Sequence, residues 1–164
     1  MATNTVIRKK SNTAAIVQAL RTTSVYIGLP QDSDAYPDGT SLIEVATDHE
    51  FGSETARSYT STRGNKVSVS GVPERSFLRS TAKEKRSEWS ELVTKGVKSV
   101  LKGKITVKDA MNKVGLRAES DVKKKIVAIS DPPNSPQVIA DKGSSNPLID
   151  TGHLVNSITH VLRK

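Results

Sequence analysis

Two long amphipathic segments joined by a short turn dominate the second half of this 164-residue chain. Over 74–101, apolar residues recur every three or four positions, which places them on one face of a helix. Gly103 ends that segment, and Thr106 belongs to a residue type that caps the start of a helix. The second helix must end before Pro132-Pro133, because the residue before a proline avoids helical backbone. The pattern predicts two long helices that each bury one apolar face.

Short β-rich segments flank this helical pair. Residues 24–29 and 157–162 are rich in β-branched side chains and predict strands. Residues 67–69 alternate as a half-buried strand does. Caps and apolar spacing predict two shorter helices, over 11–20 and 41–51. The expected fold class is therefore α+β, with a small, mainly antiparallel sheet packed on two long helices.

The length suits a single α+β domain that spans residues 1–164. Within it, the polar segment 53–66 is predicted to form an extended hairpin or loop. The proline-rich segment 131–147 is predicted to form a long loop. Loops of this length are uncommon inside compact domains and often carry function.

Positive charge is concentrated in the helical pair. Residues 75–125 hold 15 of the 25 Lys and Arg but only 6 of the 17 Asp and Glu, so that segment carries +9 and the rest of the chain −1. This asymmetry favours a partner with an acidic surface, either nucleic acid or protein, although two solvated lysine-rich helices would show it as well. Between Lys83 and Lys125 the only aromatic residue is Trp89, which falls on the apolar face, so any DNA contact should be non-specific and salt-dependent. The candidate face for DNA or an acidic partner comprises Lys83, Lys95, Lys98, Lys102, Lys113 and Lys124.

Residues that would carry catalysis or hold a metal are missing or scattered. The chain has no cysteine, which excludes disulfides and thiolate zinc sites. Its three histidines lack a His-x-x-x-His spacing, and the sequence contains no Gly-x-Ser-x-Gly motif. Asp48-His49-Glu50 lie on one predicted helix, where adjacent side chains do not converge on one ion. The chain also lacks an apolar run of about 18 residues, so we expect no membrane span, no enzyme and no cofactor.

Four segments follow one another in a recognisable order. They are Val25-Tyr26-Ile27-Gly28-Leu29-Pro30, residues 46–52 with His49-Glu50-Phe51-Gly52, residues 72–79 with Pro73-Glu74-Arg75-Ser76-Phe77-Leu78, and a C-terminal block over 132–158 with Leu148-Ile149-Asp150-Thr151-Gly152-His153-Leu154. Together they resemble the neck and tail-completion proteins of tailed bacteriophages, also described as virion morphogenesis or tail-component proteins. The resemblance covers about residues 24–160.

The resemblance implies a structural virion protein that joins the tail to the head. It would act as a neck, tail-completion or tail-terminator subunit in a homo-oligomeric ring, for which we expect a hexamer, with a dodecamer as the alternative. Its partners would be the adjacent phage connector and tail proteins, with non-specific contact to genomic DNA. It would be located in the virion after assembly in the host cytoplasm, without enzymatic activity or cofactor. The competing interpretation is a free-standing basic protein that binds DNA without sequence specificity.

Seven residues are candidates for subunit contacts. Pro73 fixes the entry of the long helix, and Phe77 and Leu78 anchor its first turn. This would leave Glu74 and Arg75 pointing outward across an interface, although a plain helix N-terminus explains them too. The two loop segments are expected to reach neighbouring subunits and to order on assembly. The candidate interface comprises Glu74, Arg75, Arg79, Arg57, Tyr59, Arg63 and Lys142.

Overall fold

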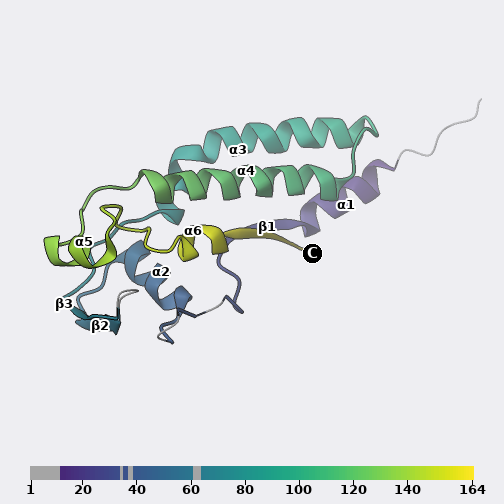
Figure 1. Cartoon of the computed structure of the whole chain (residues 1–164). Helices are drawn as coiled ribbons and strands as arrows, with labels where there is room; N and C mark the ends of the chain where they lie inside the picture. The colour runs from purple at the N-terminus through teal and green to yellow at the C-terminus, as the bar shows by residue number, and fades with distance from the viewer. Residues whose placement is uncertain (1–11, 34, 37–38, 61–63) are drawn as a thin grey trace, which may run out of the picture.

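The computed structural model describes residues 12–33, 35–36, 39–60 and 64–164. These residues form an α+β structure in which a small antiparallel sheet accompanies the helices, as the sequence predicts (Figure 1). In chain order the elements are α1 (Thr13–Thr22), β1 (Ser24–Gly28), α2 (Leu42–Phe51), β2 (Arg57–Thr60), β3 (Lys66–Val69), α3 (Leu78–Leu101), α4 (Val107–Ala128), α5 (Pro136–Lys142), α6 (His153–Ser157) and β4 (Thr159–Arg163).

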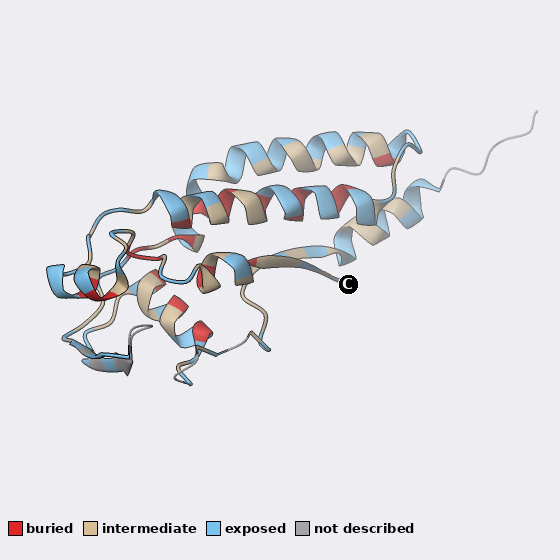
Figure 2. Cartoon of the chain, in the orientation of Figure 1, coloured by how far each residue is buried: buried red, intermediate tan, exposed pale blue. Residues whose placement is uncertain are grey.

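The two long helices α3 and α4 form an antiparallel pair that runs along the molecule (Figure 1). Helix α4 begins with a capping box: Thr106 Oγ1 accepts from the Asp109 backbone N–H, and the Asp109 carboxylate accepts from the Thr106 backbone N–H, both at 3.1 Å. Figure 2 shows buried residues recurring along α4, whereas most of α3 is exposed. Helix α4 is therefore the central element, with α3 on one side and the sheet on the other.

The start of α3 differs from the prediction. The helix begins at Leu78 rather than near residue 74, so Pro73 lies five residues before it and not in its first turn. The physical reason is an N-terminal cap supplied from another element, the Glu50 side chain of α2. A cap that comes from a distant part of the chain leaves no local signal at the helix start.

Strands β1 and β4 pair antiparallel, with Ser24 opposite Arg163 and Gly28 opposite Thr159. One face of this sheet packs toward α4, where Val25 and Leu162 join the buried residues of the α3–α4 pair. The opposite face exposes Tyr26, which lies across from Val161 in the register. Strands β2 and β3 form a separate antiparallel hairpin, so the strands make two two-stranded sheets rather than the one expected.

The core has two centres. The larger one lies where α2, α4 and α6 meet, around the fully buried Phe77 and Ile126. The smaller one lies near the α3–α4 turn around Val100 and Met111, and α1 covers it with Ile16 and Leu20. Apolar side chains from elements distant in sequence thus hold both ends of the helical pair.

The segment 131–147, expected as a loop, contains helix α5. Ser135 caps its start by accepting from the Val138 backbone N–H, and Pro136 occupies the first turn, where proline needs no donor. Gly143 ends it in the left-handed conformation, at φ 73°. The sequence contains these start and stop residues, but the proline and glycine around them favoured the prediction of a loop.

Candidate functional site

Glu50 joins α2 to the beginning of α3. The residue is only 3% exposed, and its carboxylate accepts hydrogen bonds from the backbone N–H groups of Phe77 and Leu78, both at 2.8 Å, and of Arg79 at 2.9 Å. A helix leaves these N–H groups without partners, and its dipole favours a negative charge beside them. Burial alone would raise the pKa of Glu50, but the hydrogen bonds from Leu78 and Arg79 outweigh it and hold the pKa below its usual value. The ionised carboxylate therefore fixes where α3 begins.

Arg75 is buried, at 4% exposure, which corrects the expectation that it points outward. Its Nε donates to the Pro132 carbonyl at 2.7 Å, and its Nη2 donates to the Pro133 carbonyl at 3.0 Å and to Asn134 Oδ1 at 3.2 Å. Its Nη1 lies 3.2 Å from His49 Nδ1. Because a guanidinium only donates, His49 accepts through Nδ1 and carries its proton on Nε2. Arg75 thus ties the segment before α3 to the chain that leads into α5.

A groove of about 1250 Å³ lies between α2, the β2–β3 hairpin and α5. Among its lining residues, His49 is neutral near pH 7, because burial and the nearby charges of Arg75 and Lys142 lower its pKa to about 3. Lys142 donates to the carbonyls of Asn146 at 3.2 Å and Pro147 at 3.4 Å. Burial lowers the pKa of Lys142, although Asp150 opposes this shift. The groove presents a half-buried cation held by backbone oxygens, an arrangement suited to holding chain segments together.

The candidate residues on the 53–66 segment are placed only in part. Arg57 and Tyr59 lie in β2, opposite Val69 and Val67 in the hairpin register, while Arg63 lies outside the described residues. The hairpin contacts α5, because Asn65 Nδ2 donates to Asp141 Oδ1 at 2.7 Å. The two segments that were expected to reach outward are therefore hydrogen-bonded to each other.

Glu74 and Arg79 remain at the surface, as the prediction requires. The Arg79 guanidinium pairs with the Glu50 carboxylate at 3.1 Å and with the Glu74 carboxylate at 2.8 Å. It also lies 4.4 Å from the centroid of the Phe51 ring, which is 60% exposed. This contact holds a large aromatic side chain on the outer surface at the end of α2. Sequence reasoning did not select Phe51 as an interface residue, although its place in His49-Glu50-Phe51-Gly52 could have indicated it.

All six lysines of the candidate basic face are exposed. Lys95 lies 3.7 Å from Glu91, while the other five make no ion pair within the described residues. Residues 95–113, which include the α3–α4 turn, carry six lysines and one acidic residue, Asp109. In contrast, Lys125 pairs with Glu84, and Lys123 pairs with Glu119. Uncompensated positive charge is therefore concentrated at the turn end of the helical pair.

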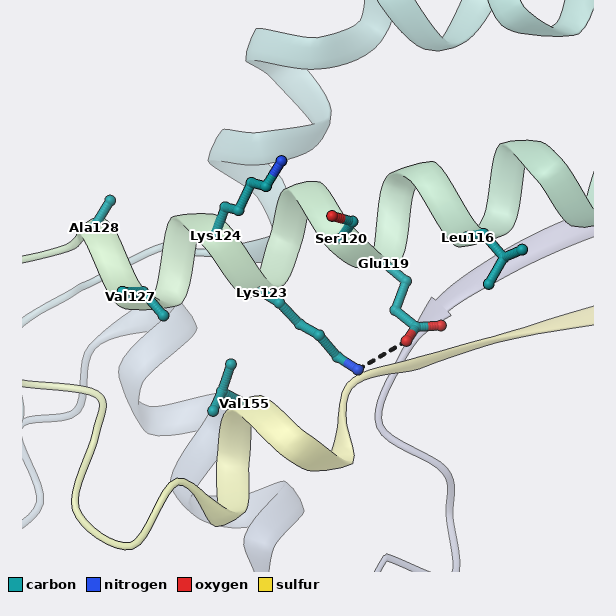
Figure 3. A pocket seen from close by; sticks show the side chains of 8 residues that line it. All are labelled: Leu116, Glu119, Ser120, Lys123, Lys124, Val127, Ala128 and Val155. Carbon is teal, nitrogen blue, oxygen red and sulfur yellow. Dashed lines mark hydrogen bonds and ion pairs between the residues drawn. The ribbon is translucent and has the colours of Figure 1, made fainter.

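A second groove, of about 430 Å³, lies between α4 and α6 (Figure 3). Its apolar walls include Leu116 and Val127 from α4, which are 53% and 56% exposed, and Val155 from α6. Lys123 and Lys124 border it, and Figure 3 shows Lys123 turned toward Glu119, with their charged atoms 2.8 Å apart. Leu116 and Val127 lie outside the buried face of α4, which includes Ala118, Val122 and Ile126. In the sequence, these two apolar residues off the buried face were the signal for a second apolar stripe on α4.

Within the described residues, no three His, Asp or Glu side chains are grouped as a metal site. No helix in the same part of the chain is long and apolar enough to cross a membrane. Comparison of the chain with known protein families, curated proteins and solved structures finds no match.

Proposed function

We propose that this chain is a structural virion protein of the tailed-phage head-to-tail junction. It works as a neck, tail-completion or tail-terminator subunit in a homo-oligomeric ring, a hexamer by preference and a dodecamer as the alternative. Its partners are further copies of itself and the adjacent connector and tail proteins. Its action is geometric: a rigid body sets the curvature of the ring, and no bond is made or broken in a substrate.

The observation that carries this proposal is the convergence of three of the four family-like segments. Glu50 of the second segment caps the helix that begins within the third, and Arg75 of the third holds the start of the fourth. Buried charged groups are costly unless they are fully paired, so these contacts hold the three segments in one fixed arrangement. Their linkage supports the proposal that these segments work as one structural unit.

Exposed apolar side chains on separate elements support an assembly role. Phe51 on α2, Tyr26 on β1 and Val127 on α4 each expose more than half of their surface. Single exposed apolar residues are ordinary, but a groove such as that between α4 and α6 favours a protein partner.

The direct test is the mass and shape of the purified protein. Light scattering after size exclusion should report a closed oligomer, and negative-stain images should show rings with rotational symmetry. In phage particles that lack the protein, filled heads should accumulate beside free tails. A protein that stays monomeric at high concentration and leaves virion assembly intact when deleted would refute the proposal.

The second candidate function, non-specific DNA binding by the free protein, is favoured by the lysines of residues 95–113. Contacts from about five lysines would make log K fall with log salt at a slope near −4 to −5. Titration of duplex DNA between about 50 and 200 mM salt measures that slope. Micromolar affinity of the monomer at physiological salt would favour this function over the ring. Weak binding that strengthens only in the oligomer would fit a basic face that borders the DNA passage.

A further inference from the structure

The groove between α2, the β2–β3 hairpin and α5 contains two positive charges that lack a counter-ion. Arg75 is buried and Lys142 is half-buried, and both side chains line this groove. Each donates to backbone carbonyls, but neither forms an ion pair with any of the described residues. The carbonyls satisfy the N–H groups and leave the charges uncompensated. A charge removed from water is costly unless an opposite charge accompanies it.

The pKa values of these cations reflect the missing counter-ion. Burial lowers the pKa of Arg75, whereas a hydrogen bond to Asp121 and the charge of Glu88 raise the pKa of Arg117 on α4. Burial also lowers the pKa of Lys142, against the opposing charge of Asp150, and the charge of Arg75 adds to the decrease. Arg75 and Lys142 therefore lie close enough to repel each other, and an anion beside both would relieve that repulsion.

The same part of the groove also has hydrogen-bond donors that lack acceptors. Because Arg75 donates to His49 Nδ1, the imidazole proton lies on Nε2, which makes no hydrogen bond within the described part of the chain. Asn134 Oδ1 accepts from Arg75, while the Nδ2 of the same side chain is buried without a partner. Lys142 donates two hydrogen bonds, although an ammonium carries three protons. All four side chains line the groove, so its unmet donors and its unpaired charges occur together.

Three carboxylates also line this groove, those of Glu44, Asp48 and Asp150. None of them pairs with Arg75 or Lys142. Asp150 is exposed and acts on Lys142 through its charge, without an ion pair. An incoming anion would therefore displace no carboxylate from either cation.

We infer that this part of the groove, formed by His49, Arg75, Asn134 and Lys142, binds a phosphate group. A phosphate group carries a charge of about −1.5 to −2 at pH 7 and three strong acceptor oxygens, which suits two cations with donors beside them. A carboxylate carries a single charge and would leave one of the two cations uncompensated. The site does not depend on the proposed ring function, because it lies within one copy of the chain.

Calorimetric titration with inorganic phosphate, at an ionic strength held constant with sodium chloride, tests the site. Asn134→Asp is the sharpest variant, because it keeps an oxygen for Arg75 and supplies the carboxylate that this guanidinium lacks. It should fold normally and bind phosphate at least about tenfold more weakly. Lys142→Met removes one positive charge but keeps the apolar stem, and should also weaken binding by about tenfold or more. Asp150→Asn removes the carboxylate that acts on Lys142, so it should bind phosphate more tightly.

Asn12→Asp is the matched control, since it adds the same charge at the exposed start of α1, at the other end of the molecule (Figure 1). It should bind phosphate as the unmodified protein does. Phosphate that produces no more heat than sodium chloride overturns the inference. So does an Asn134→Asp variant that is folded by circular dichroism and retains full affinity. An equal loss of affinity in Asn12→Asp also overturns it, because net charge alone would then explain the effect.

Discussion

Glu50 and Phe77 lie 27 residues apart and are joined by a 2.8 Å hydrogen bond from the Phe77 backbone N–H to the Glu50 carboxylate. The bond links the end of α2 to the start of α3 across the larger core, where the Phe77 ring is completely buried. A carboxylate that accepts several backbone N–H groups holds the helix end more firmly than a local serine or threonine cap would. The orientation of α2, and with it the direction of its exposed face, depends on this one side chain.

Glu50→Ala should therefore destabilise the fold by about 3 kcal/mol or more, because it leaves several buried N–H groups of α3 without an acceptor. Glu50→Gln keeps one acceptor oxygen but loses the charge, and should cost less. Urea unfolding at neutral pH measures both. Glu74→Gln, which removes the exposed partner of Arg79, is the control and should change stability by no more than about 0.5 kcal/mol. Equal effects of Glu50→Ala and Glu74→Gln would contradict the capping role.

Arg75→Lys should destabilise the protein although it preserves the charge. A lysine ammonium cannot reproduce the planar fork that reaches the Pro132 carbonyl, the Pro133 carbonyl and His49 at once. We expect a loss of about 2 kcal/mol, measured by urea unfolding, together with faster amide exchange at the start of α5. Arg86→Lys serves as the control, since Arg86 lies exposed on α3. A stable Arg75→Lys variant with unchanged exchange would show that the fork does not hold this segment.

His49 should make stability depend on pH. Its pKa is about 3 in the folded protein, against an ordinary value of 6.5, so between these two values the unfolded chain binds more protons. The stabilisation that His49 provides by remaining neutral in the fold is fully present above pH 6.5. The free energy of unfolding then declines as the pH falls toward 3, by up to about 1.4 kcal/mol per pH unit. His49→Gln retains an acceptor for Arg75 but cannot be protonated. Unfolding curves at about pH 7 and pH 5 should therefore differ less in the variant than in the unmodified protein. Identical pH slopes would mean that His49 does not remain neutral in the fold.

How far the sequence predicts this molecule depends on whether a feature is local. Periodicity and capping residues that lie next to one another in the sequence predict the helical pair, the Thr106 cap and strands β1 and β4. The burial of Arg75 does not, because it depends on carbonyls from the segment 132–133, which is distant in the sequence. The same holds for the Glu50 cap, since a helix with its acceptor 27 residues away looks uncapped in the sequence.

Surface features divide in the same way. The six lysines of the candidate basic face are exposed, because charge density in an amphipathic helix indicates its solvated side. The α4–α6 groove was missed, because its walls come from two elements that only the fold brings together. In the sequence, Leu116 alone would suggest an irregularity in the apolar pattern. Only the fold shows that Leu116 and Val155 line the same groove.

Gly115 and His160 supply the last prediction. Gly115 lies on α4 beneath the imidazole of His160 from β4, whose ring nitrogens lie 2.8 Å from Glu119 Oε2 and 2.9 Å from Asn112 Oδ1. A Cβ at position 115 would lie 2.7 Å from His160 Cγ, so the ring would have to move and break both contacts. Gly115→Ala should therefore destabilise by about 2 kcal/mol, despite the better helix propensity of alanine.

Gly96→Ala is the matched comparison on α3. There the new Cβ would lie 3.1 Å from the Ala110 Cβ, a contact that a shift of a few tenths of an ångström relieves. The gain in helix propensity, about 1 kcal/mol, should offset that strain and leave stability nearly unchanged. Thermal unfolding of both variants measures the difference. If Gly115→Ala were as stable as Gly96→Ala, the imidazole would not be held against α4, and the packing of β4 on this helix would need another explanation.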